Sequence, residues 1–256
     1  MTKAKEKENR IKKERNNLVV QSNTLIRNLK AIKDDLTVSE QKLIVYMISK
    51  ICADDKDFKT VSLNLSEYCQ ICGIKKSGRE YERIKQSIKN LRNKSWWIKN
   101  NNEEILFAWI DTAKIKRYKT IELTISEPLK PYLLELTENF TKYELINVLC
   151  LRSKYSIRLY EIFKSYLWLG IWEISIEEFR ELLNIQNKYS SFRELNRSVI
   201  IPTLKEINKF TDLQINVSTQ KNGNKVDKLI FNIKETDYQM IFDTFLNQDK
   251  RLDGKK

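Results

Sequence analysis

The feature of this sequence that most limits its fold is a pattern of apolar residues that occurs twice. The segment LSEYCQICGI at residues 65–74 matches IEEFRELLNI at residues 176–185 in the spacing of its apolar side chains. The matched positions are Leu65 with Ile176, Tyr68 with Phe179, Cys72 with Leu183, and Ile74 with Ile185. The 256 residues are therefore expected to form two domains of one fold rather than a single large domain.

The first copy has the element order of a winged helix-turn-helix domain. Apolar spacing and capping signals predict helices over residues 40–51, 66–73 and 77–93, with a short extended piece at residues 60–63. Beyond residue 93 the apolar period changes from about 3.6 to about 2, which indicates strands at 105–109 and 121–125. The basic segment 114–119 lies between these strands and forms the expected tip of the wing.

The second copy repeats this order. A helix is expected from about Ser191, and strands at 213–217 and 229–233 flank Lys221-Asn-Gly-Asn-Lys225, in which Asn-Gly indicates a tight hairpin turn. Pro202 lies too deep to begin that helix, so we expect a kink or break there. The predicted fold class is α+β, with two tandem winged helix-turn-helix domains related by the internal repeat.

Composition divides the rest of the chain. Residues 1–20 carry seven Lys and Arg residues and few apolar ones, which predicts a basic, flexible tail. We expect the N-terminal winged helix at 21–126, a connector at 127–149, the C-terminal winged helix at 150–235, and a C-terminal tail at 236–256.

The charge of the chain favours a polyanionic partner. The formal net charge is +13, with 47 Lys and Arg residues against 34 Asp and Glu residues. The sequence lacks a long apolar run and a signal-peptide core, so we expect a cytoplasmic protein with reduced cysteines and no membrane contact.

Catalysis is disfavoured by the absence of histidine, which removes Ser-His and Cys-His nucleophile pairs and imidazole metal ligands. Adjacent carboxylates such as Asp54-Asp55 point apart on a helix or strand and seldom converge on one ion. We therefore expect no enzymatic activity, no metal and no cofactor.

Two short motifs resemble functional sites. The stretch GIKKSGRE at residues 73–80 has the glycine spacing of a P-loop, but Arg79 and Glu80 replace the required Lys and Ser or Thr. Gly73 is better explained as the left-handed residue that ends a helix. Cys69 and Cys72 form a C-x-x-C pair, yet the repeat places Cys72 at a core position, so neither zinc nor redox chemistry is expected.

Candidate DNA contacts lie on the second helix of each helix-turn-helix and on each wing. Long polar donors on one helix face suit phosphates and base edges, although an ordinary solvated face would show the same pattern. In the first copy the candidates are Arg79, Arg83, Gln86, Asn90 and Lys94 on the helix, and Lys116, Arg117 and Lys119 on the wing. In the second copy they are Ser190, Ser191, Arg193, Asn196 and Arg197 on the helix, and Lys221, Asn222 and Lys225 on the wing. Trp96, Trp97 and Trp109 are expected in the wing core.

Several segments resemble the iteron-binding plasmid replication initiator (Rep) family. They are NTLI at 23–26, LTVSEQK at 36–42, NFTKY at 139–143, LRSKYSIRLYEI at 151–162, and PTLKEIN at 202–208. The resemblance implies a non-enzymatic protein whose two winged helices bind repeated double-stranded DNA sites at a plasmid origin and help to open it. It also implies a homodimer through the N-terminal domain, binding to the protein's own operator, and contacts with the host initiator and replicative helicase.

Two other functions remain open on the sequence alone. A transcriptional repressor without a role in initiation would have the same two domains and the same motifs. An enzyme, such as a Mg²⁺ nuclease or a relaxase with a tyrosine nucleophile, would instead nick supercoiled DNA or form a covalent adduct with it.

Overall fold

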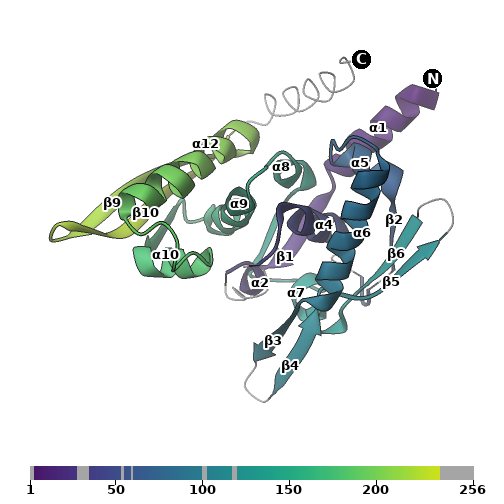
Figure 1. Cartoon of the computed structure of the whole chain (residues 1–256), viewed down its shortest axis with the longest axis horizontal. Helices are drawn as coiled ribbons and strands as arrows, with labels where there is room; N and C mark the ends of the chain where they lie inside the picture. The colour runs from purple at the N-terminus through teal and green to yellow at the C-terminus, as the bar shows by residue number, and fades with distance from the viewer. Residues whose placement is uncertain are drawn as a thin grey trace. The chain divides into compact units, whose positions relative to one another are not determined.

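The computed structural model describes residues 3–27, 35–52, 55–58, 60–99, 103–116 and 120–236. The chain divides into two compact units: Met1–Ile32 with Ser39–Leu149 (unit 1), and Lys33–Val38 with Cys150–Lys256 (unit 2) (Figure 1). Among the helices described, none combines the length and the apolar character needed to cross a membrane.

Unit 1 contains a winged helix. Its elements are α4 (Val38–Ile48), β2 (Val61–Asn64), α5 (Leu65–Ile71), α6 (Gly78–Asn93), β5 (Ile110–Lys116) and β6 (Thr120–Ile125). The three strands form an antiparallel sheet in the order β2-β6-β5. The α5–α6 pair is the helix-turn-helix, and β5 with β6 is the wing, as Figure 1 shows.

Unit 2 repeats this arrangement. Its elements are α9 (Lys154–Tyr166), β8 (Ile171–Ser175), α10 (Ile176–Leu182), α11 (Phe192–Leu195), η3 (Asn196–Ile200), α12 (Ile201–Phe210), β9 (Leu213–Asn222) and β10 (Lys225–Glu235). The sheet order β8-β10-β9 is that of unit 1, with the last strand in the middle. The internal repeat therefore confirms the predicted fold class.

Aromatic and branched side chains fill both cores. In unit 1, Tyr46 of α4 meets Tyr68 of α5 edge to face, with ring centroids 4.9 Å apart. In unit 2, Phe231 of β10 lies 5.1 Å from Phe163 and 5.3 Å from Trp172, centroid to centroid. The tyrosine pair joins two helices of unit 1, and the contacts of Phe231 join α9 and β8 to the central strand of unit 2.

Both helix-turn-helix turns depend on a residue with positive φ. Gly73 has φ 63° and Asn184 has φ 52°, and each follows the end of the first helix of its motif. The next N–H closes the helix: that of Ile74 donates to the Cys69 carbonyl at 2.7 Å, and that of Ile185 to the Arg180 carbonyl at 2.9 Å. Gly73 is thus a helix-ending residue, as predicted, and belongs to no phosphate loop.

Pro202 does not break its helix. Residues 192–210 remain helical, and the turn before the proline is the π-helical segment η3, in which the Ile201 N–H donates to the Asn196 carbonyl. A proline donates no hydrogen bond, and its ring crowds the carbonyl four residues earlier. The wider π turn makes room for that ring. The predicted kink or break thus takes the form of a π segment within a continuous helical stretch.

The expected N-terminal tail is structured in the part described. Residues 3–27 form α1 (Lys3–Arg15), β1 (Leu18–Ser22) and α2 (Asn23–Arg27). β1 pairs with β7 (Phe140–Glu144), and both partners of the pair Val19 and Tyr143 are buried. The flexible tail predicted from composition is therefore wrong for this part, because the distant strand β7 forms backbone hydrogen bonds with β1.

The expected connector also belongs to unit 1. It contains η2 (Glu127–Leu129), α7 (Lys130–Leu133), β7 and α8 (Leu145–Leu149). Most of their apolar side chains are buried, whereas Phe140 is exposed. The predicted C-terminal tail lies outside the described residues, apart from Thr236.

An additional hairpin precedes the first wing. β3 (Ser95–Lys99) pairs with β4 (Glu104–Ala108), separately from the three-stranded sheet. Trp109 is buried at 1% exposure, whereas Trp97 lies on this hairpin and is 58% exposed. The expected strand 105–109 is therefore not part of the wing, and Trp97 is not a wing core residue.

A buried carboxylate links the two long helices of unit 1. Glu40, in the first turn of α4, has 0% exposure. Its two oxygens accept from the side-chain nitrogen of Asn90 at 2.8 Å and from Nζ of Lys94 at 2.9 Å, and both donors belong to the end of α6. Gln86 in turn donates to Asn90 at 2.8 Å. These bonds compensate for the cost of burying the charge.

The first prediction concerns the two turns. Gly73→Ala should lower the free energy of unfolding by about 1–2 kcal/mol, because a Cβ at that positive φ approaches its own carbonyl oxygen. The control Asn184→Gly should leave stability unchanged or slightly higher. Urea unfolding followed by tryptophan fluorescence measures both; equal midpoints for Gly73→Ala and wild type would contradict the left-handed assignment.

The second prediction concerns the buried carboxylate. Lys94→Met should cost about 2–4 kcal/mol of stability, because the Glu40 charge then loses its ionic partner while remaining buried. Combining it with Glu40→Gln should recover part of that loss. If Lys94→Met unfolds at the wild-type urea concentration, the ion pair has no structural role.

Candidate nucleic-acid interface

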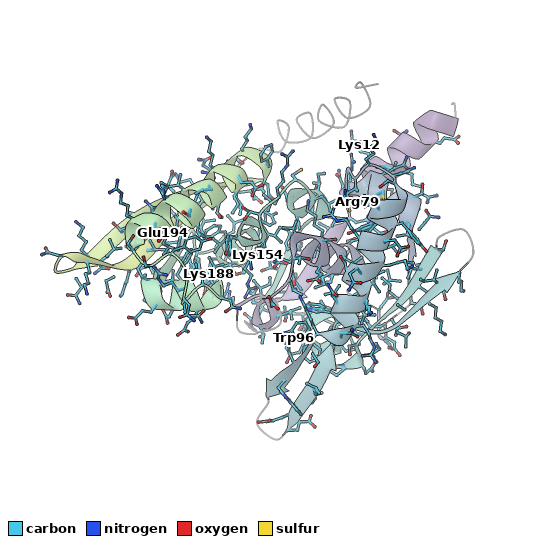
Figure 2. The ribbon with its side chains drawn as sticks, viewed as in Figure 1. Lys12, Arg79, Trp96, Lys154, Lys188 and Glu194 are labelled. Carbon is cyan, nitrogen blue, oxygen red and sulfur yellow. The ribbon has the colours of Figure 1, made fainter. Side chains whose placement is uncertain are left out.

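The exposed candidates on α6 lie between its start and its middle. Ser77 caps the helix by accepting the N–H of Glu80 at 3.2 Å, and Arg79, Arg83 and Gln86 are exposed. Figure 2 labels Arg79 at the start of this helix. Arg83 donates to the carboxylate of Glu80 at 2.9 Å, but 65% of its side chain remains exposed. The helix thus presents cations at its start and an amide at its middle to solvent.

The two candidates in the second half of α6 contact the protein itself, which the sequence did not predict. Asn90 and Lys94 point their polar groups at buried Glu40, so the structure gives them a role between helices. The stripe at helical spacing could not show this, because a face that is polar throughout can pack against a buried carboxylate as well as against solvent.

Of the three candidate cations on the first wing, Lys116 lies within the described residues. Lys116 is exposed at the end of β5 and forms an ion pair with Glu122 of β6. The other candidates on this tip, Arg117 and Lys119, lie outside the described residues together with Tyr118.

The second recognition helix begins at α11. Ser191 caps it by accepting the N–H of Glu194 at 3.2 Å, while Ser190 lies within 3.5 Å of the Glu194 carboxylate. Arg193 and Arg197 are exposed, and Asn196 is half-buried. The two arginines lie one turn apart, so they share one face of the helix.

The turn before α11 is held by an arginine that the sequence did not point out. Arg180 of α10 donates to the backbone carbonyls of Lys188 and Tyr189, both at 2.6 Å. Tyr189 itself has φ 55°, an unfavourable conformation for a side chain of that size. Burial raises the pKa of Tyr155 to about 12, and a hydrogen bond between its side chain and that of Tyr189 acts in the same direction.

These contacts fix the entry to the second recognition helix. The sequence gives one indication of this role of Arg180: in the repeat, Arg180 occupies the position of Cys69, which is buried in the first copy. A single departure from an apolar match does not reveal which carbonyls the arginine binds.

The second wing is a long, exposed hairpin. Lys221, Asn222 and Lys225 are all exposed at its tip, where Asn222 pairs with Lys225. Gly223 between them has φ 60°, as a tight hairpin turn requires. The wing thus carries two cations on a rigid support.

No group of three or more Cys, Asp and Glu side chains in the described part of the chain could hold a metal ion. Cys69 and Cys72 are buried free thiols, and burial raises the pKa of Cys72 to about 12. A thiol in that environment stays protonated, so it is a poor metal ligand and nucleophile.

Solved structures share this fold. The crystal structure of the Pi initiator protein in complex with iteron DNA matches 88% of this chain and 99% of its own, with a TM-score of 0.75 and 19% identity. Domains 2 and 3 of RctB match 79% of this chain and 84% of their own, with a TM-score of 0.50 and 14% identity.

Sequence relatives give a more specific result. The chain is 32% identical over 235 residues to a replication initiation protein of Escherichia coli, covering 87% of this chain and 72% of that protein. It is 30% identical over 148 residues to a probable replication protein of Bifidobacterium longum, covering 52% and 50%. The family described as "Initiator Replication protein, WH1" matches residues 18–164, and "Initiator Rep protein, WH2" matches residues 175–233. The chain therefore belongs to the family of replication initiator proteins with two winged-helix domains.

Proposed function

We propose that this protein initiates plasmid replication by binding repeated double-stranded DNA sites, the iterons of an origin, through both winged helices. The single observation that carries the proposal is the exposed N-terminal half of each recognition helix, with Arg79 and Arg83 on one and Arg193 and Arg197 on the other. Family membership supports it, and so does the shared fold of the Pi initiator, which was solved on iteron DNA.

The second winged helix is assigned the main part in base recognition. Recognition helices usually meet base edges near their N-termini, and an arginine can bind guanine through two hydrogen bonds. Arg193 and Arg197 lie in that region of their helix, whose entry is fixed by Arg180 and Tyr189. Lys221 and Lys225 on the wing are assigned to phosphates, as is Lys116 on the first wing.

The remaining features of this proposal rest on the family. The protein acts without nucleotide, metal or catalysis, and it helps to open the origin for the host initiator and replicative helicase. A homodimer through the N-terminal domain, and binding to the protein's own operator, belong to the same proposal.

The third prediction tests binding and initiation together. On the DNA flanking its own gene, the protein should protect repeated sites of more than about 12 base pairs each, because each winged helix occupies one major groove. Protection should persist with a chelator and without ATP. A plasmid carrying the protected region should replicate only when the protein is supplied.

Two results would contradict this account. Dependence of the footprint on ATP or on a divalent metal would exclude the proposed mode of binding. Normal protection without replication of the plasmid would identify a repressor instead of an initiator.

The fourth prediction separates base reading from phosphate binding. Arg193→Ala or Arg197→Ala should cost about 1–3 kcal/mol on the protected site and much less on random duplex. Lys221→Ala or Lys225→Ala should weaken both complexes by similar factors and flatten the plot of log affinity against log salt by about one unit. Fluorescence anisotropy on both duplexes measures these effects; sequence discrimination lost only in the lysine variants would reverse the assignment.

A further inference from the structure

The turn between α9 and β8 carries apolar side chains on the surface of unit 2. Trp168 is 76% exposed, Leu169 47% and Ile171 40%, and we call these three residues the Trp168 patch. The stretch SYLWLGIW at residues 165–172 contains no charged residue. Single exposed apolar residues are ordinary on a protein surface, but three within four positions of the chain indicate a surface that another apolar group covers.

The patch lies next to the aromatic core of unit 2. Trp172 is buried, and its ring stacks on that of Phe231 at 5.3 Å and on that of Tyr166 at 5.7 Å, centroid to centroid. Tyr166 is half-buried, and Trp168 follows it by two residues. The core thus supports the turn that carries the patch, so a partner would cover a surface that is already ordered.

Strand β10 ends beside this patch. The N–H of Ile233 donates to the carbonyl of Gly170, within the turn, at 2.8 Å. Glu235, the last residue of β10, forms an ion pair with Lys164 of α9 at 2.9 Å, and Lys164 precedes Trp168 by four residues. The chain beyond β10 therefore starts close to the patch.

The sequence that follows β10 is rich in apolar residues. Six of the ten residues in DYQMIFDTFL, at positions 237–246, are apolar: Tyr238, Met240, Ile241, Phe242, Phe245 and Leu246. This segment lies outside the described residues and outside the family match, which ends at residue 233. Because apolar side chains gain free energy by leaving water, a segment of this composition favours contact with an apolar surface.

The short connection favours a contact within one molecule. Tyr238 follows the last described residue, Thr236, by two positions, and an extended residue spans about 3.3–3.6 Å, so the segment can reach the patch while β10 stays paired. A group joined by a short linker acts at a concentration on the order of millimolar. A second copy at micromolar concentration competes at a disadvantage of about a thousandfold. Phosphates are disfavoured because the patch contains no cation.

We propose that residues 237–246 pack on the Trp168 patch and complete the surface of the second winged helix. The inference is independent of DNA binding by the recognition helix. It assigns a binding site to a segment that lies beyond the family match. It also makes the patch inaccessible to other proteins while the segment occupies it.

The fifth prediction measures cleavage of the full chain by chymotrypsin, with mass spectrometry locating the cuts. Trp168→Ser combined with Leu169→Ser should speed cleavage within residues 237–246 at least about tenfold, because the segment loses the surface that protects it. The matched control is Trp97→Ser combined with Leu106→Ser, which removes an exposed pair of the same two residue types from the β3–β4 hairpin. This control should leave the cleavage rate unchanged.

The reverse experiment changes the segment and observes the patch. Phe242→Asp combined with Phe245→Asp should expose Trp168 and increase the quenching of tryptophan fluorescence by acrylamide. The control Asn247→Asp with Gln248→Asp adds the same two charges at polar positions and should leave the quenching as in wild type.

Three results would overturn the inference. One is an equal rate of cleavage in wild type and in the Trp168→Ser, Leu169→Ser variant, with circular dichroism melts also equal. Another is protection that increases with protein concentration, because a second copy would then occupy the patch. The third is equal quenching in wild type and in the Phe242→Asp, Phe245→Asp variant.

Discussion

In each winged helix, the last strand of the sheet pairs with the first strand, and this pairing stabilises that domain. β6 pairs with β2, placing Ile121 opposite Leu63, and β10 pairs with β8, placing Phe231 opposite Trp172. The helices enclosed by these pairs are short: α5 and α10 have seven residues each, too few to be stable alone in water. These helices are stable because the three-stranded sheet gives their apolar sides a surface to pack against. The wing is a consequence of the same pairing, since the middle strand must turn back beside its neighbour to complete the sheet.

The recognition helix is held in place by different contacts in the two copies of the fold. In unit 1, α6 is fixed at its far end, where Asn90 and Lys94 bind the buried carboxylate of Glu40. In unit 2, the helix is fixed at its entry, where Arg180 binds the carbonyls of the preceding turn, and a π turn accommodates Pro202 further along. Both solutions leave the N-terminal half of the helix exposed. Recognition helices usually contact base edges with residues of this half, so two unrelated sets of contacts leave the corresponding surface open in both units.

Much of this fold could be predicted from the sequence because its signals are local. The match between residues 65–74 and 176–185 gave both helix-turn-helix motifs, and Asn-Gly gave the second wing. What escaped prediction depends on contacts between distant segments. β1 pairs with β7, which lies more than a hundred residues further along the chain. Helix α1 has a basic composition that is also typical of a mobile tail. Lys94 looked like a groove contact because its spacing on α6 is right, but the carboxylate that binds it belongs to another helix. Spacing along one helix shows which side chains share a face, and it does not show what that face meets.

Part of the positive charge on the recognition helix of unit 1 is neutralised within that helix. The first turns of α6 carry Glu80 and Glu82 among the basic residues, and these carboxylates pair with Arg83 and Lys85. Such pairs reduce the positive potential where phosphates would approach, and exposed pairs of this kind contribute little stability in return. A helix arranged in this way binds DNA weakly unless neighbouring elements add charge. The wing can do so through Lys116, although Glu122 partly neutralises it. Helix α1 removes one negative charge from the surface of α5, because its Arg10 pairs with Glu67. The first winged helix is therefore suited to hold the duplex backbone, and the second, with Arg193 and Arg197 exposed on one helix face, is suited to read its sequence.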